Sequence, residues 1–376
     1  MAVNAVAVGM GDDVLRRVAR RTEPIASVYI GLDPATRSEP ELDLPLRWQA
    51  VIERLTHESA DPATVARLTW HLVPATPSSV GLGLFASSGN LLLAVPLRGF
   101  TGPDMARFAA PAHLLPLLAF RQNHPAHVLA VTDRTGAEIV TSLDGGIVSH
   151  SVVVQGPDDE IERNAPGGWS QPRYQRRAED SWRHNAARVA TVAARALGAS
   201  GATLLLVIGD VRAVQLLEDQ LPLAVRRAVT IRHLPGGRSP DGSRPERDAL
   251  IARAAREHSA RETSLLLDRF AEESGPAGRA VQGAAATLAA LATGQVATLL
   301  VTADQADDRL AWFGPGAAQV YGRPDEPAAA GVPIRPGRLA DVAVRVALCT
   351  DATVRVLAPG MPAAPAEGLG ALTRFG

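Results

Sequence analysis

Apolar and polar residues alternate along the chain in patterns that predict three regions, each combining strands with helices. In the first region, a β-favouring run is followed by two helical patterns and then by a hairpin. The hairpin turn is Ser87–Asn90, in which glycine and asparagine suit the positive φ of a tight turn. The expected elements are a strand at 26–30, helices at 46–55 and 62–72, and strands at 80–86 and 91–97. Residues 1–122 are therefore predicted to form an α+β domain.

The second region begins where the chain changes character, between Pro116 and Pro125. Three strand patterns come first, and helices then alternate with two more strands, the second helix capped by Asp210. The expected strands are 127–132, 137–142, 147–154, 203–208 and 228–233, and the long helices are 175–197 and 246–274. Three hairpin-connected strands before the first helix predict an RNase H-like mixed sheet in residues 123–262.

The third region, residues 263–376, alternates again and predicts a small α/β sandwich. The expected elements are a helix at 278–293, a strand at 296–302, a loop carrying Trp312 and Phe313, a helix at 339–349, a strand at 353–357 and a linker-like tail at 358–365. The predicted fold class is thus α/β, with three domains.

Composition narrows the functional classes. The 376 residues are 46% hydrophobic and 20% charged, and no apolar run is long enough to cross a bilayer, so a cytoplasmic protein without a membrane partner is expected. The single cysteine, Cys349, excludes an internal disulfide framework and a thiolate zinc cluster. Phosphate-binding, zinc-protease and serine-hydrolase motifs are also missing, and no cofactor or metal is predicted.

Charge is balanced overall, at a formal net −1, but one stretch is strongly asymmetric. Residues 125–162 carry one arginine against seven acidic residues, including the cluster at 158–162, whereas residues 163–195 carry seven arginines against two acidic residues. All positive residues are arginine, which favours bidentate contacts with phosphate and carboxylate groups. This step from acidic to basic predicts either a self-paired loop or an interaction surface.

The basic stretch contains the most informative cluster of residues. Paired glycines allow a close approach to a partner, arginines pair with phosphates, and Trp169 or Tyr174 can stack on a base. The candidate RNA-binding residues are Gly167, Gly168, Trp169, Ser170, Gln171, Arg173, Tyr174, Arg176, Arg177, Arg183, His184 and Arg188. On the helix that follows, the stripe Ala178, Trp182, Ala186, Val189, Ala193 and Ala196 should face the sheet, and the stripe Arg177, His184, Arg188 and Arg195 should face outward. A solvated helix with a glycine hinge explains the same pattern.

Two carboxylates offer a different chemistry. Asp133 and Asp210 follow strands of the predicted RNase H-like sheet, where paired carboxylates could hold Mg²⁺ for phosphodiester cleavage. A turn residue and a helix N-cap explain these two positions equally well. An RNase H-fold nuclease therefore stays open as an alternative.

The chain as a whole resembles the bacterial relatives of archaeal and eukaryotic class-one release factors and Pelota. Within them it is similar to the actinobacterial branch related to the ribosome-hibernation factor Balon. The stretches that carry the resemblance are ASVYIGLD at 26–33, DRTGAEI at 133–139, GGWSQPRYQRRAED at 167–180, VIGDVRAVQLLEDQLP at 207–222, GRAVQGAAATLAALATGQVATLLV at 278–301 and GLGALTRF at 368–375.

The resemblance implies a protein that occupies the A site of the ribosome and directs its middle-domain loop towards the peptidyl-transferase centre. Release factors position water there with a Gly-Gly-Gln tip, but in this chain Trp169 stands in the glutamine place and Gln171 comes two residues later. We therefore expect a hibernation factor, active under stress, that binds ribosomal RNA without hydrolysis. The alternative is a peptidyl-tRNA hydrolase, a release or rescue factor, with Gln171 as its catalytic residue. The resemblance also suggests elongation factor Tu as a partner.

Overall fold

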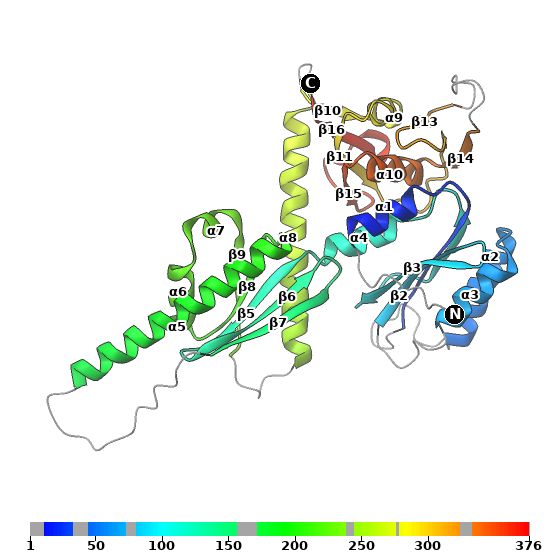
Figure 1. The fold of residues 1–376 in the computed structure, drawn as a ribbon. Coiled ribbons are helices and arrows are strands. Elements are labelled where there is room, and N and C mark those ends of the chain that lie inside the picture. The colour runs from blue at the N-terminus through cyan, green and yellow to red at the C-terminus, as the bar shows by residue number, and fades with distance from the viewer. Residues whose placement is uncertain are drawn as a thin grey trace. The chain divides into compact units, whose positions relative to one another are not determined.

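The computed structural model describes residues 11–32, 44–72, 80–155, 171–237, 244–275, 278–323 and 333–375, and of residues 80, 171–180 and 244 it describes the backbone alone. The chain forms two compact units, one made of Met1–Gln122 with Thr263–Gly376 and the other of Asn123–Glu262. Helices and strands are interleaved throughout both (Figure 1), so the predicted α/β class is confirmed. The separation of 1–122 from 263–376 as two domains stays a prediction. No helix in the described ranges is long and apolar enough to cross a membrane.

A five-stranded sheet organises the unit Asn123–Glu262. Its order is β7-β6-β5-β8-β9, in which β5, β6 and β7 are antiparallel neighbours and β8 and β9 run parallel to β5. The strands are β5 (His127–Thr132), β6 (Gly136–Leu143), β7 (Ile147–Gln155), β8 (Leu204–Gly209) and β9 (Thr230–Leu234). The apolar runs of β5 and β8 are buried because parallel central strands are covered on both faces.

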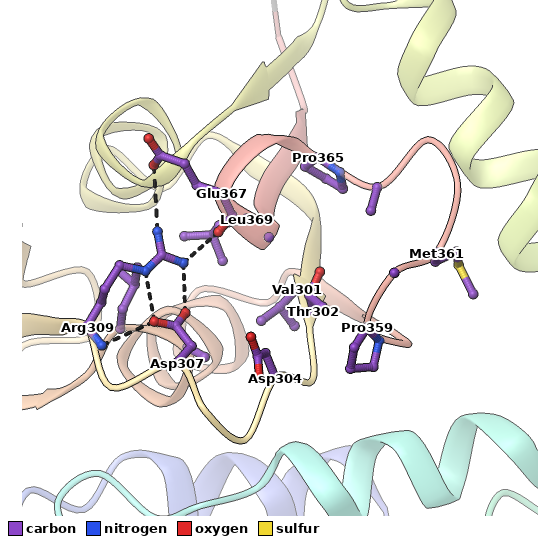
Figure 2. Close-up of a pocket in the computed structure, with 15 residues that line it drawn as sticks. Val301, Thr302, Asp304, Asp307, Arg309, Pro359, Met361, Pro365, Glu367 and Leu369 are labelled. Carbon is purple, nitrogen blue, oxygen red and sulfur yellow. Dashed lines mark hydrogen bonds and ion pairs between the residues drawn. The ribbon is translucent and has the colours of Figure 1, made fainter.

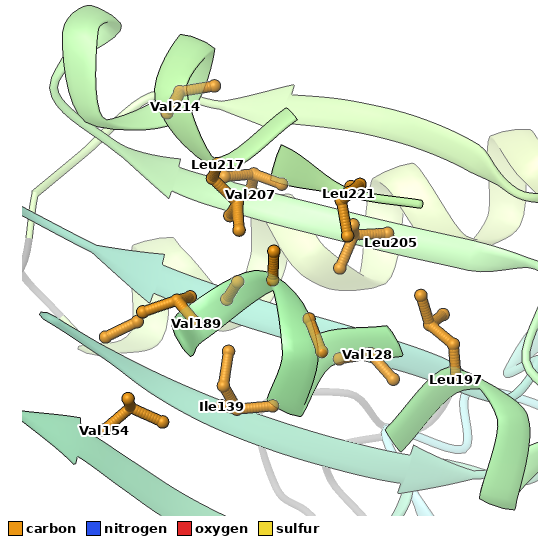
Figure 3. Close-up of a cluster of buried hydrophobic side chains, with 14 of the residues drawn as sticks. Val128, Ile139, Val154, Val189, Leu197, Leu205, Val207, Val214, Leu217 and Leu221 are labelled. Carbon is orange, nitrogen blue, oxygen red and sulfur yellow. The ribbon is translucent and has the colours of Figure 1, made fainter. Parts of the chain in front are cut away.

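Helices cover both faces of this sheet. On one face, α5 (Gln171–Ser200) and α6 (Val211–Gln220) enclose a core that includes Val189, Leu205 and Leu217 (Figure 3). On the other, α8 (Arg244–Glu272) packs through Ala254 and Ala255. The short α7 (Leu223–Ala228) was not predicted, because it has no buried residue and therefore leaves no amphipathic pattern.

The N-terminal part of the other unit has a four-stranded antiparallel sheet in the order β3-β2-β1-β4. Trp48, Leu55 and Leu68 from its helices pack on the sheet. Its elements are α1 (Asp12–Ala19), β1 (Ile25–Ile30), α2 (Leu44–His57), α3 (Pro62–Leu72), β2 (Val80–Ser87), β3 (Asn90–Arg98), β4 (Met105–Ala109) and α4 (Leu115–Asn123). The hairpin turn takes positive φ at Ser88 and Gly89, so the expectation for asparagine was wrong.

The C-terminal part of the same unit contains a sheet in the order β10-β16-β11-β15 and a smaller sheet in the order β13-β12-β14. The strands are β10 (Ala280–Gln282), β11 (Val296–Thr302), β12 (Leu310–Phe313), β13 (Val320–Tyr321), β14 (Arg335–Arg338), β15 (Thr353–Leu357) and β16 (Leu369–Thr373). The helices are α9 (Ala284–Ala292), α10 (Leu339–Cys349) and the short 3₁₀ helix η2 (Ala366–Gly368). Every residue of α10 is buried, including Cys349.

Two expectations for this part were wrong, and one strand was missed. The predicted helix 278–293 is a strand followed by a helix, because Gly283, with φ of 84°, breaks the backbone between them. Trp312 and Phe313 lie in β12 and not in a loop, since cross-strand pairing with β13 and β14 fixes them. The tail 358–365 leads into an unpredicted strand, β16, which pairs with both β10 and β11.

Candidate functional site

Helix α5 has one face fixed in the core and another that is open. Ala186, Val189 and Ala193 are buried against the sheet, and Trp182 is half-buried. On the rest of the helix surface Arg183, His184, Arg188 and Arg195 are exposed. For residues 181–200, the apolar stripe predicted from the 3.6-residue period thus faces the sheet, and the predicted basic stripe is exposed. Because the buried face fixes the rotation of the helix, the basic side chains are held away from the core.

The proposed RNA-binding residues divide into three groups by what the structure describes. Gly167, Gly168, Trp169 and Ser170 lie outside the described residues. The backbone of the next group forms the first two turns of α5, and these residues are Gln171, Arg173, Tyr174, Arg176 and Arg177. Arg183, His184 and Arg188 are exposed on the helix surface described above. RNA binding by all twelve residues stays a prediction.

Two arginines stack on the tryptophan of α5, and this cluster was not predicted. The guanidinium Cζ atoms of Arg134 and Arg212 lie 4.8 Å and 5.3 Å from the centroid of the Trp182 ring. Arg134 belongs to the turn after β5, and Arg212 to the first turn of α6, after β8. Since β5 and β8 are parallel neighbours, their carboxyl ends meet and bring these side chains together. In the sequence both arginines come within three residues after a strand, but only the strand order places them side by side.

The amide side chain of Asn185 ties α5 to the same turn. Its Nδ2 donates a hydrogen bond to the backbone oxygen of Arg134 at 3.2 Å, and the residue is 4% exposed. Helix α5 therefore holds the turn that carries Arg134 in two ways, through the Asn185 hydrogen bond and through the Trp182 ring.

Asp133 and Asp210 have structural partners at this edge of the sheet. The Oδ1 of Asp133 accepts hydrogen bonds from the backbone N–H of Thr135 and Gly136, at 2.8 Å and 2.9 Å. The Oδ1 of Asp210 accepts from the N–H of Arg212 and Ala213, both at 3.0 Å. Within the described ranges, no group of three or more histidine, cysteine or acidic residues is arranged to hold a metal ion. The two carboxylates are thus accounted for as a turn residue and a helix N-cap.

A pocket of about 420 Å³ opens in the C-terminal part of the other unit (Figure 2). Its charged lining is largely paired, since Arg309 donates to Asp307 from Nε and Nη2 at 2.8 Å and 2.7 Å and to the backbone oxygen of Glu367 at 2.6 Å. These bonds lower the pKa of Asp307 and raise that of Arg309. The network ties the chain before β12 to the segment before β16, which is a structural role.

The comparisons with known proteins agree with the release-factor resemblance. Residues 126–276 match the model of bacterial archaeo-eukaryotic release factor family 2. The uncharacterized protein Rv2629 of Mycobacterium tuberculosis strain H37Rv is 26% identical over 300 residues, which are 78% of each chain.

Two Pelota structures are weakly similar over most of the chain. Archaeal Pelota, in a model of its ribosome-bound form, is 12% identical over 97% of this chain and 94% of that one, with a TM-score of 0.41. Archaeoglobus fulgidus Pelota is 14% identical over 80% of each chain, with a TM-score of 0.34. Likenesses of this size carry no argument about function, so the resemblance to release factors rests on the sequence match. The likeness to bacterial archaeo-eukaryotic release factor family 2 is therefore a likeness of residues 126–276, the part of the chain that matches the family model.

Proposed function

We propose that this protein is a ribosome-associated translation factor whose middle unit binds ribosomal RNA in the A site. The observation that carries the proposal is the exposed basic flank of α5, Arg183, His184 and Arg188, on a helix whose opposite face is locked into the core. Such a surface suits phosphate contacts, because its arginines are presented in a fixed direction. The match of residues 126–276 to the model of a release-factor family supports the choice of the ribosome as the RNA partner.

We further propose that the loop before α5 enters the peptidyl-transferase centre without hydrolysing peptidyl-tRNA. Trp169 occupies the place of the release-factor glutamine, and Gln171 is the first residue of α5. A glutamine held in a helical turn is poorly suited to act from the tip of a loop. From the likeness to the Balon branch, the same proposal includes a role in ribosome hibernation during stress. It places the protein in the cytoplasm, with elongation factor Tu as a partner.

Co-sedimentation of the full chain with purified ribosomes tests the proposal. Arg183→Glu/Arg188→Glu reverses two charges on the basic flank, and Arg226→Glu/Arg227→Glu makes the same change on two exposed residues of α7. A charge-assisted hydrogen bond contributes about 1.5–3 kcal/mol, so we expect the first variant to lose at least about tenfold in affinity and the second to bind normally. The proposal fails if the wild-type chain stays in the supernatant at low salt, or if both variants bind equally.

Peptide release from stalled ribosomal complexes decides between non-catalytic binding and hydrolysis. We expect no release by the wild-type chain. Release that is abolished by Gln171→Ala would establish the hydrolase alternative instead.

A further inference from the structure

Strand β7 is an edge strand of the five-stranded sheet. It is the outermost strand on its side, and among the described residues no strand pairs with its outer edge. Its nine residues, IVSHSVVVQ, contain no lysine, arginine, acidic residue or proline. Edge strands normally carry such residues, because unpaired backbone N–H and C=O groups invite another strand. The edge of β7 is therefore competent to receive an added strand.

The regular part of this edge is six residues long. His150–Gln155 pair with Gly136–Thr141 of β6 without interruption, and the register shifts only next to Ser149. On the side of the sheet away from α5, Val153 is 57% exposed. An added strand would thus have a continuous hydrogen-bonding edge over His150–Gln155 and apolar side chains beside it.

A groove runs beside the same strand, on the face that α5 covers. It has a volume of about 390 Å³ and lies between the C-terminal half of α5 and the strands β6 and β7. Its apolar lining includes Ile139, Val152, Val192 and Ala196. A side chain of a strand added to β7 would reach this groove, because alternate side chains of neighbouring strands point to the same face.

Two basic side chains at the groove have no partner in the described part of the chain. Arg195 of α5 and His150 of β7 both line it, both are exposed, and neither forms an ion pair or hydrogen bond with a described residue. The positive charge of Arg195 is complementary to a carboxylate, and the imidazole of His150 can donate a hydrogen bond to one. The apolar lining favours a peptide over a nucleic acid, because a sugar-phosphate backbone gains little from contact with valine and isoleucine.

We propose that the edge of β7 and this groove bind an extended acidic segment of a partner protein. The segment adds to the sheet as a further strand through backbone hydrogen bonds, inserts an apolar side chain between α5 and β7, and places a carboxylate at Arg195 and His150. The inference goes beyond the proposed function and does not depend on it, since it concerns a protein ligand and not ribosomal RNA.

Fluorescence anisotropy with the full chain and labelled peptides tests the proposal without ribosomes. The probe is a decapeptide of alternating valine and glutamate with blocked ends, and the control peptide alternates valine and lysine. We expect the acidic peptide to bind at least tenfold more tightly than the basic one. Arg195→Glu should reverse the preference, whereas Arg226→Glu, the same change on an exposed residue of α7, should leave it unchanged. Hydrogen exchange should show protection of the amides in His150–Gln155 when the acidic peptide is bound.

Four results would overturn the proposal. The first is equal affinity for the two peptides, and the second is an acidic-peptide affinity that Arg195→Glu does not change. The third is displacement of the peptide by a dodecauridylate RNA whose own binding depends on Arg195, which would make the groove a nucleic-acid surface. The fourth is protection of His150–Gln155 that rises with protein concentration in the absence of peptide, which would make a second copy of this chain the occupant.

Discussion

Replacing Asp210 separates a structural role for this carboxylate from a catalytic one. Asp210 has extended backbone angles, with φ of −67° and ψ of 148°, and its Oδ1 accepts two backbone hydrogen bonds at the start of α6, both at 3.0 Å. Loss of a capping side chain costs about 0.5–2 kcal/mol. The ion pair with Arg134 adds less than about 0.5 kcal/mol, because its atoms are 3.8 Å apart and the side chains are 54% and 43% exposed.

We therefore expect Asp210→Ala to destabilise α6 locally by about 1 kcal/mol, which raises its opening equilibrium about fivefold. Asp210→Asn keeps the acceptor oxygen and should change the stability by less than about 0.5 kcal/mol. Amide hydrogen exchange of Arg212 and Ala213 in the full chain measures this opening, and moderate salt screens the change in charge.

Alanine removes both the charge and the acceptor oxygen of Asp210, whereas asparagine removes the charge alone. Equal effects of the two substitutions would therefore refute the capping role, because they would trace the effect to the charge. The same pair tests the nuclease alternative. Mg²⁺-dependent RNA cleavage by the wild-type chain, lost in both variants, would assign Asp210 a catalytic role. We expect no such cleavage, since both candidate carboxylates already have backbone partners.

Three further predictions concern the two compact units. Leu217→Ala should lower the free energy of unfolding, measured by chemical denaturation, by about 2–5 kcal/mol, because Leu217 is fully buried. The control Leu223→Ala, at a residue 54% exposed, should lower it by less than about 0.5 kcal/mol. Similar losses in the two variants would contradict the assigned core. Asp104→Asn should cost about 1.5–3 kcal/mol, because the partly buried guanidinium of Arg47 loses a charged partner at 2.6 Å but keeps its hydrogen bond to the backbone oxygen of Gly31. A cost no larger than that of Arg253→Gln, in an exposed ion pair, would contradict this. Hydrogen bonds from Arg279 lower the pKa of Glu273 from 4.5 to about 2, so the stabilising contribution of Glu273 is present above pH 4.5 and is lost as the pH falls towards 2. NMR titration should find this pKa, and Arg279→Gln should return it towards 4.5. An unchanged pKa in the variant would refute the assigned cause.

Local signals in the sequence were sufficient to predict the strands of the middle sheet and the helix N-cap at Asp210. Strand β8 is a continuous apolar run that ends at a capping aspartate, and both features depend on neighbouring residues alone. The open flank of α5 followed from helical periodicity for the same reason.

Features that depend on distant pairing were missed. Strand β14 has the sequence RPGR, which no strand pattern predicts, and it exists because it pairs with β12. The stack of Arg134 and Arg212 on Trp182 requires β5 and β8 to be neighbours, a fact of topology that no local pattern contains. Strand order is therefore the information that sequence reasoning lacked at this site.

A density map of the full chain bound to the ribosome tests the central claim most directly. We expect the middle unit in the A site, Arg183 and Arg188 against ribosomal RNA phosphates, and Trp169 pointing towards the peptidyl-transferase centre. A map in which the chain binds elsewhere on the ribosome, or in which the basic flank of α5 faces solvent, would contradict it.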